Sequence, residues 1–240
     1  MASTTKVMTL LLAVEAGNLD QMVTVGQDAA ALVNGDNSYM GLSAGEQVTL
    51  RDLLYGLVLP SGNDAAVAIA DAIGGSVVAF VAMMNVRAQQ LGLTQTHFVS
   101  PDGLDDGNHT SARDLAVLTA VALLQHPEIA QITSTLHYII PQTATHKAYE
   151  LWSGNDLLSG ARSPYPGAIG VKPGFTDAAR YCQAFAARRH GHLIVGVVLG
   201  DWSWEERISD MRALLDWGFA QEGVPPAPPP VPFSPISPEV

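Results

Sequence analysis

The sequence predicts an α+β protein in which a helical cluster packs against an antiparallel sheet. Apolar residues recur at helical spacing through most of residues 1–135, and short β-branched or alternating segments follow up to residue 199. A last helical pattern covers residues 204–219 and could pack across the sheet. With 48% hydrophobic and 15% charged residues, a chain of 240 residues can bury a full core.

The expected helices are bounded by capping residues and by Gly or Pro. Ser3 stands at the start of the first helix, Thr49 and Ser111 can serve as N-caps, and Pro60 stops the second helix. In chain order we expect helices over residues 4–16, 50–59, 64–73, 77–91 and 111–125. Residues 61–63 therefore form a loop between two helices.

The expected strands are short and are punctuated by Gly or Pro. They cover residues 136–141, 168–175, 180–187 and 193–199. His190-Gly191 lies where a hairpin turn is needed between the last two strands, and Trp202 and Trp204 are expected to cover the sheet. The single cysteine, Cys182, reads as a buried structural thiol in the third strand.

The end of the chain differs in composition from the rest. Residues 223–240 are rich in proline and predict a polyproline-like, disordered tail without a packed core. We therefore expect one domain over residues 1–222, followed by this tail. No internal repeat interrupts the domain.

Charge and composition exclude several function classes. The net charge of −11, with no stretch that concentrates Lys and Arg, argues against nucleic acid as a partner. No apolar segment reaches the roughly 20 residues that a transmembrane helix needs, and no secretory signal precedes Met1. A single cysteine cannot form an internal disulfide.

The three lysines of the chain indicate a candidate chemistry. Lys6 and Lys172 lie in the short segments Ser3-Thr-Thr-Lys and Lys172-Pro-Gly, whereas nine arginines and Lys147 fill the other basic positions. An arginine cannot lose its proton in a protein, but a buried lysine can become neutral and act as a general base. This pattern suggests that Lys6 and Lys172 belong to a reactive site.

Ser3 and Lys6 have the spacing of a nucleophile and its base. Three residues apart at a helix start, their side chains lie on one helical face, so a neutral Lys6 amine could take the Ser3 hydroxyl proton. Lys172 is the second cation that, together with burial, would depress the pKa of Lys6. Ser61 could relay a proton to the leaving amine, and the Asn63 amide could orient Lys6 and bind the substrate backbone.

The order of these segments resembles a known family. S-x-x-K at a helix start, S-x-N in a loop and K-x-G in a late strand are typical of the serine D-alanyl-D-alanine carboxypeptidases, the low-molecular-mass penicillin-binding proteins. The resemblance covers about residues 1–220. Further segments similar to that family are Leu59-Pro-Ser-Gly-Asn-Asp-Ala-Ala, His97-Phe-Val-Ser-Pro-Asp-Gly-Leu and Gly174-Phe-Thr-Asp-Ala-Ala.

The resemblance implies a β-lactamase/transpeptidase-like fold and an extracytoplasmic enzyme without cofactor or metal. Such an enzyme removes the terminal D-alanine from peptidoglycan stem peptides through an acyl-serine, and β-lactam antibiotics acylate the same serine. The implied catalytic residues are Ser3, Lys6 and Ser61. The implied substrate-binding residues are Asn63, Lys172, Gly174, Phe175 and Thr176, with the backbone N–H groups of Ser3 and Phe175 as the oxyanion hole.

The chain departs from the family pattern at its third motif. Pro173 replaces a threonine whose hydroxyl helps to hold the substrate carboxylate, and Thr176 or Arg180 are the candidates to replace it. Proline lacks an N–H group, so we expect Pro173 on the edge of the sheet.

The second departure lies at the N-terminus. Family members have a signal and early strands ahead of the serine, so we expect a sheet without its first strands and a poorly soluble or weakly active protein.

Two other functions remain open at this stage. A serine β-lactamase would share the acylation residues but needs a deacylating group, for which Glu128 and Glu150 are the candidates. A non-catalytic peptidoglycan-binding protein is the other alternative, suggested by Pro173. A calcium loop at residues 102–108 is less favoured than a turn, because the spacing lacks a closing glutamate.

Overall fold

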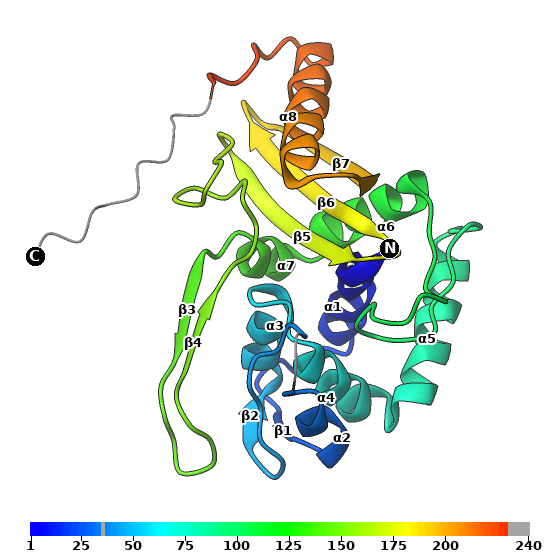
Figure 1. Ribbon diagram of the computed structural model, residues 1–240, viewed down its shortest axis with the longest axis vertical. Coiled ribbons are helices and arrows are strands. Elements are labelled where there is room, and N and C mark those ends of the chain that lie inside the picture. Colours follow the sequence, from blue (N-terminus) through cyan, green and yellow to red (C-terminus); the bar gives the residue numbers. More distant parts are fainter. Residues whose placement is uncertain (35–36, 230–240) are drawn as a thin grey trace, which may run out of the picture.

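The structure is a computed structural model that describes residues 1–34 and 37–229, and its α+β architecture confirms the predicted fold class (Figure 1). A short 3₁₀ helix, η1 (Ala2–Thr5), leads into the first α-helix. The α-helices are α1 (Lys6–Glu15), α2 (Gln27–Ala31), α3 (Leu50–Val58), α4 (Asn63–Gly74), α5 (Val77–Gln90), α6 (Ala112–Gln125), α7 (Pro127–Thr133) and α8 (Trp204–Gln221). The strands are β1 (Met22–Thr24), β2 (Gln47–Thr49), β3 (His137–Ile140), β4 (Tyr149–Trp152), β5 (Ala168–Thr176), β6 (Arg180–Arg189) and β7 (His192–Asp201).

The main sheet is antiparallel and has the order β5-β6-β7 within the described residues. A tight turn at His190-Gly191 joins β6 to β7, as predicted. Strand β5 lies at one edge of the sheet, which explains how it accommodates Pro173 without losing a ladder donor. Two small hairpin-like sheets, β1-β2 and β3-β4, lie outside this main sheet.

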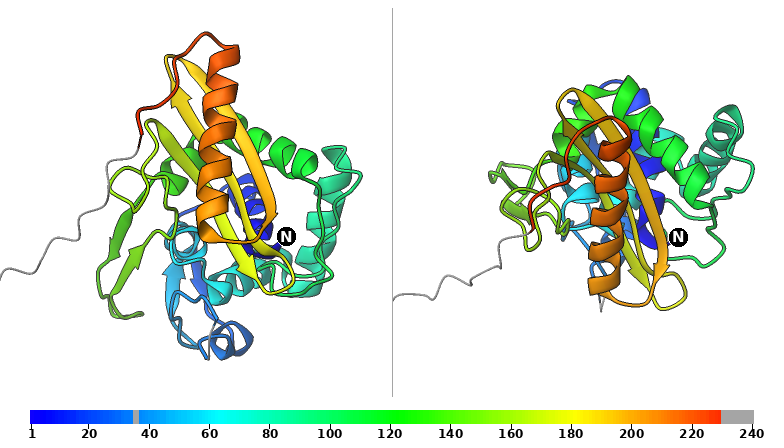
Figure 2. Two further views of the ribbon diagram at one scale, coloured as in Figure 1. Left: turned by 45° about the horizontal axis from the view of Figure 1, so that its top comes forward. Right: turned by 90° about the horizontal axis from the view of Figure 1, so that it is seen from above.

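The main sheet is covered on both faces (Figure 2). Helix α8 packs along β6 and β7 on one face, and Phe185, Met211 and Phe219 lie in the core between them. On the other face, η1, α6 and α7 contact the sheet and join it to the helical part of the molecule. A larger core fills the space between α1, α3, α4 and α5, where Met8, Leu11 and Leu54 are fully buried.

The predicted N-cap residues mark the observed starts of two helices. The Thr49 and Ser111 hydroxyls accept hydrogen bonds from the N–H groups of Asp52 and Asp114, as expected for N-caps. Helix α7 was not expected, because Pro127 reads as a helix stop. It instead occupies the first turn of α7, where its missing N–H group costs nothing. The sequence analysis also did not predict the short elements β1, α2, β2 and β4.

Trp202 and the first residues of the Pro-rich segment do not lie as the sequence predicts. Trp202 does not cover the sheet: it is 71% exposed and stacks on the Arg180 guanidinium, so that prediction was wrong. Val224 is buried against α8, and the Ala227 N–H group donates to Asp216, so the first residues of the Pro-rich segment contact the domain. Residues 230–240 of the predicted tail lie outside the described residues.

Helix length bears on membrane insertion. Within residues 1–34 and 37–229, no single helix has the length and apolarity that a bilayer crossing requires. Only the bent pairs α4–α5 and α6–α7 reach that size when taken together, and they bend by 83° and 109°.

Candidate active site

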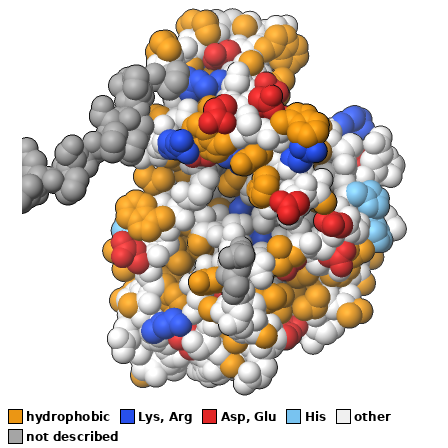
Figure 3. Space-filling model, in the orientation of Figure 1, with side chains coloured by type: hydrophobic (Ala, Val, Ile, Leu, Met, Phe, Trp, Pro, Cys, Tyr) orange, Lys and Arg blue, Asp and Glu red, His pale blue; other side chains and the backbone are white. Residues whose placement is uncertain are grey.

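The three sequence motifs converge on one cleft between the helical part and strand β5. The cleft has a volume of about 350 Å³, and Figure 3 shows basic side chains at the bottom of the hollow between the two parts of the molecule. Its walls include Ser3 from η1, Ser61 from the α3–α4 loop, and Lys172 and Gly174 from β5. Residues more than 160 positions apart in the sequence therefore meet at one place.

Ser3 and Lys6, which the sequence analysis predicts to be nucleophile and base, lie within hydrogen-bond distance of each other. The chain winds from η1 into α1 between them, and the Lys6 Nζ atom lies 3.0 Å from the Ser3 Oγ atom. The same Nζ lies 2.7 Å from the Asn63 Oδ1 atom and 2.7 Å from the backbone oxygen of Asp102. Lys6 is 1% exposed, and these three oxygens are its hydrogen-bond partners within the described residues.

This environment suits a neutral amine. Burial lowers the pKa of Lys6 to about 8, although the carboxylates of Asp102 and Asp64 oppose the shift. A neutral amine has two N–H donors and one lone pair. The two carbonyl oxygens can accept both N–H groups, and the lone pair then points at the Ser3 hydroxyl.

The loop that carries Ser61 is held by backbone contacts. Ser61 has a left-handed φ of 65°, and the Gly62 and Asn63 N–H groups donate to the Gly56 and Ser38 oxygens. The next residue in the chain, buried Asp64, accepts hydrogen bonds from four backbone N–H groups, those of Met40, Gly41, Leu42 and Ala65. The Ser61 hydroxyl has no protein partner among the described residues.

Lys172 is the second buried amine of the cleft. It is 2% exposed and donates a hydrogen bond to the Pro173 oxygen at 2.9 Å. Burial lowers its pKa well below the usual lysine value, and the neighbouring cations Lys6 and Arg207 lower it further. Lys6 thus contributes to the lowered pKa of Lys172, whereas the lowered pKa of Lys6 comes from burial and not from Lys172, which the sequence analysis had expected to contribute.

Gly174 allows β5 to approach the serine. A Cβ atom at this position would lie 2.8 Å from the Ser3 nitrogen and 3.0 Å from the Thr4 nitrogen, closer than a side chain tolerates. Because β5 is an edge strand, alternate backbone groups of this strand face the cleft. Ser3 and Phe175, whose N–H groups are expected to form an oxyanion hole, both line the cleft.

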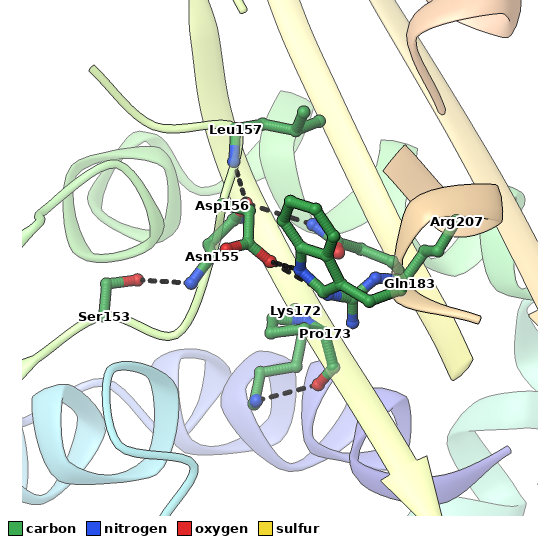
Figure 4. Close-up of polar contacts among 9 residues, drawn as sticks. Ser153, Asn155, Asp156, Leu157, Lys172, Pro173, Gln183 and Arg207 are labelled. Atoms are coloured by element: carbon green, nitrogen blue, oxygen red, sulfur yellow. Dashed lines mark hydrogen bonds and ion pairs between the residues drawn. The ribbon is translucent and has the colours of Figure 1, made fainter. Parts of the chain in front are cut away.

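Arg207 is a cleft residue that the sequence analysis missed. It comes from the first turn of α8, is 5% exposed, and lines the cleft beside Lys172. Its Nη2 atom donates to the Asp156 Oδ2 atom at 2.9 Å, and the same oxygen accepts the Trp204 indole N–H group at 2.7 Å (Figure 4). No spacing motif links residues 156 and 207, so only the packing of α8 on the sheet reveals the pair.

Other residues proposed from the sequence lie away from the cleft lining. Thr176 lines a different small pocket, and its hydroxyl accepts the Ala179 N–H group. Arg180 stacks on Trp202. Glu128 lies near His126, and Glu150 pairs with His137, so neither deacylation candidate lines the cleft.

The loop at residues 102–108 forms a turn network within the described residues. The Asp102 carboxylate accepts hydrogen bonds from Ser100 and Leu104, and the Asn108 side chain binds the Val99 N–H group. No group of three His, Cys, Asp or Glu side chains that could hold a metal occurs in residues 1–34 and 37–229. Cys182 is buried, as predicted.

Comparison with known proteins assigns the family. A family model described as D-alanyl-D-alanine carboxypeptidase, a serine peptidase family, matches residues 1–203. The chain belongs to this family. Its motifs Ser3-Thr-Thr-Lys, Ser61-Gly-Asn and Lys172-Pro-Gly lie inside the matched segment.

Sequence similarity to curated relatives extends over most of the chain. A D-alanyl-D-alanine carboxypeptidase from a Streptomyces strain is 38% identical over 231 residues, which cover 91% of this chain and 78% of that protein. The D-alanyl-D-alanine carboxypeptidase DacF of Bacillus subtilis is 36% identical, with 92% of this chain and 56% of that protein covered. The chain thus spans just over half the length of the Bacillus relative.

Solved structures of the carboxypeptidase family have the same fold. A mutant of the Streptomyces DD-transpeptidase superposes with a TM-score of 0.84 at 38% identity, covering 92% of this chain and 88% of that chain. Penicillin binding protein 5 from Haemophilus influenzae superposes with a TM-score of 0.80 at 35% identity, covering 91% and 63%. The helical part and the antiparallel sheet therefore follow the family architecture.

The buried lysines predict an unusual dependence of stability on pH. Lysine amines titrate near 10.4 in the unfolded chain and lower in the fold, so the unfolded state binds more protons between these values. Their burial therefore destabilises the fold at pH 8, and this cost fades as the pH rises. We expect the free energy of unfolding, measured with urea, to increase by about 1 kcal/mol or more from pH 8 to pH 9.5.

A double variant provides the control for this prediction. Lys6→Met with Lys172→Met removes both titrating amines, so the increase with pH should disappear. A wild-type unfolding free energy that stays flat or falls over the same interval would contradict the assignment of lowered pKa values to these lysines.

Proposed function

We propose that the protein is a serine-type D-Ala-D-Ala carboxypeptidase that removes the terminal D-alanine of peptidoglycan stem peptides through an acyl-serine intermediate. The observation that carries this proposal is the contact of the Lys6 Nζ atom with the Ser3 Oγ atom at 3.0 Å, with two carbonyl oxygens placed to accept both N–H groups of the neutral amine. Family membership and the names of the curated relatives support the substrate class.

Acylation begins with proton transfer from Ser3 to Lys6. The Ser3 Oγ atom forms a bond to the carbonyl carbon of the penultimate D-alanine, and the hydroxyl proton moves to the Lys6 Nζ atom. The negative charge that develops on the carbonyl oxygen is held by the backbone N–H groups of Ser3 and Phe175.

Collapse of this intermediate breaks the peptide C–N bond. The leaving amine needs a proton, and the Ser61 hydroxyl lines the cleft where that amine would lie. It has no hydrogen-bond partner among the described residues, Lys6 included, so the proposed relay requires the Ser61 hydroxyl to contact Lys6 and the leaving amine in the substrate complex. Water then attacks the acyl-serine, with Lys6 again as the base, and regenerates the Ser3 hydroxyl.

Arg207 is the group best suited to the terminal carboxylate of the substrate. Arg207 lines the cleft, and its Nη2 atom donates a hydrogen bond to the Asp156 carboxylate. An arginine fork binds a carboxylate with two parallel hydrogen bonds, so it can take over the contact that a threonine would make at Pro173. Lys172 adds a donor at the same end of the cleft.

The cleft is also expected to bind β-lactam antibiotics. β-Lactams carry a carboxylate next to a strained amide, so the proposed substrate contacts would hold them too. Because neither Glu128 nor Glu150 lines the cleft, we expect the penicilloyl-serine to persist rather than to be hydrolysed.

The proposed substrate also indicates where the protein acts. Peptidoglycan lies outside the cytoplasmic membrane, so the proposal places the mature protein on that side.

The function is tested by two measurements on the whole chain. We expect a fluorescent penicillin to label the wild type stoichiometrically and Ser3→Ala not at all. We also expect release of D-alanine from an acyl-D-Ala-D-Ala peptide by the wild type only. Rapid turnover of a chromogenic cephalosporin would instead support a β-lactamase, and peptide binding without labelling would support a non-catalytic protein.

Gly174 offers a test of the contact between β5 and the serine. In Gly174→Ala the new Cβ atom would displace the Ser3 backbone, and a shift of about 1 Å at a reacting group costs roughly 100-fold in rate. We expect the rate constant of penicillin labelling to fall by this order. Arg113→Gln is the control, because Arg113 is exposed at the start of α6 and lies outside the cleft lining. Equal rates for both variants would refute the proposed role of Gly174.

Arg207→Gln should affect recognition of the carboxylate. Loss of a charged hydrogen bond to the substrate costs about 1.5–3 kcal/mol, so we expect kcat/KM for acyl-D-Ala-D-Ala to fall at least tenfold. The same substitution should change kcat/KM much less for a peptide whose terminal carboxylate is replaced by an amide. A similar loss for both peptides would show that Arg207 acts on the fold and not on the carboxylate.

A further inference from the structure

A second hollow of about 370 Å³ adjoins the catalytic cleft. Gly154 lines the cleft, whereas its chain neighbours Ser153 and Asn155 line the hollow, so a single stretch of backbone separates the two. Asp156 lines the hollow on one side and binds Arg207 of the cleft on the other (Figure 4). The hollow therefore lies at the Arg207 end of the cleft.

One wall of the hollow is aromatic. The Trp152 side chain is 56% exposed, and its ring stacks on His137 with the ring centres 4.0 Å apart. Its indole N–H group donates to Glu150, which also pairs with His137. Trp152 thus presents a fixed, flat surface to whatever enters the hollow.

Another wall carries a cation without a counterion. The Arg162 guanidinium lies 4.0 Å above the centre of the Trp204 ring, and within the described residues its side chain has no hydrogen bond or ion pair. Asp156, the carboxylate that lines the hollow, is engaged by Trp204 and Arg207. Stacking covers a guanidinium face and leaves its N–H edge free to bind a planar anion.

The proposed function indicates that the side chain of the leaving residue is the part of the substrate nearest this hollow. If Arg207 holds the carboxylate of the leaving residue, that residue lies between Ser3 and the hollow. The cleft itself holds its α-carbon, and a side chain longer than a methyl group can reach the hollow by passing over Gly154, which is exposed and has open space where a Cβ atom would lie. An alanine side chain would leave the hollow unused.

We propose that the hollow lined by Trp152 and Arg162 is a subsite for a long, anionic side chain of the leaving D-amino acid. This inference rests on the proposed function. The substrate class then includes peptides whose leaving residue carries a distal carboxylate, in addition to those that end in D-alanine. Trp152 packs on the aliphatic part of that side chain, and Arg162 binds its carboxylate.

Three peptides with the same acyl donor and different leaving residues test the subsite. The leaving residues are D-alanine, D-2-aminoadipate, which ends in a carboxylate, and D-lysine, which has similar length and the opposite charge. For the wild type we expect kcat/KM to be roughly tenfold higher with aminoadipate than with lysine, the effect of one charge-assisted hydrogen bond. Equal or greater activity with D-lysine would overturn the proposal without any variant.

Arg162→Gln should remove the preference. We expect the ratio of kcat/KM for aminoadipate to that for lysine to fall about tenfold in this variant. Arg113→Gln is the matched control: Arg113 is exposed at the start of α6, outside the cleft and the hollow, and should leave the ratio unchanged. A ratio that is the same in Arg162→Gln and in the wild type would refute the role of Arg162.

Failure of this inference differs from failure of the proposed function. If only the subsite is wrong, D-alanine release and penicillin labelling of Ser3 persist and the preference for aminoadipate is absent. If the proposed function is wrong, no leaving residue is released from any of the three peptides.

Discussion

The site depends on one buried amine that the fold keeps near neutrality. Lys6 lies at the start of α1 with almost no exposed surface, and its Nζ atom lies within hydrogen-bond distance of the oxygens of Ser3, Asn63 and Asp102. Burial disfavours the ammonium form and outweighs the opposing effect of the Asp102 and Asp64 carboxylates. An arginine at either position would stay charged, which explains why this chain places two of its few lysines here.

Much of the surrounding structure serves to hold this amine and its partners in place. Four backbone N–H groups bind Asp64 and thereby fix the segment around residues 40–42 next to the S-x-N loop. Gly174 lets strand β5 approach η1, so the two halves of the molecule meet at the serine. Helix α8 then adds Arg207 from the far face of the sheet, anchored by Asp156. Each contact joins elements that are distant in the sequence.

The sequence predicted the features that depend on local patterns. Helical periodicity and the Thr49 and Ser111 caps gave the long helices, and the short motifs identified Ser3, Lys6, Ser61 and Lys172, which the structure brings to one cleft. Features that depend on tertiary packing were missed. The Asp156–Arg207 pair joins a loop to a helix 51 residues later, and no spacing rule describes such a contact. Trp202 was expected over the sheet, but an arginine from the neighbouring strand holds it at the surface.

The most direct test is the titration of Lys6 itself. With only three lysines in the chain, labelling with [ε-¹³C]lysine gives three side-chain signals, and Lys6→Met assigns one of them. The account predicts that the Lys6 signal titrates with a pKa near 8 in the folded protein. A Lys6 pKa at or above the ordinary lysine value of 10.5 would leave the serine without a base and contradict the proposed mechanism.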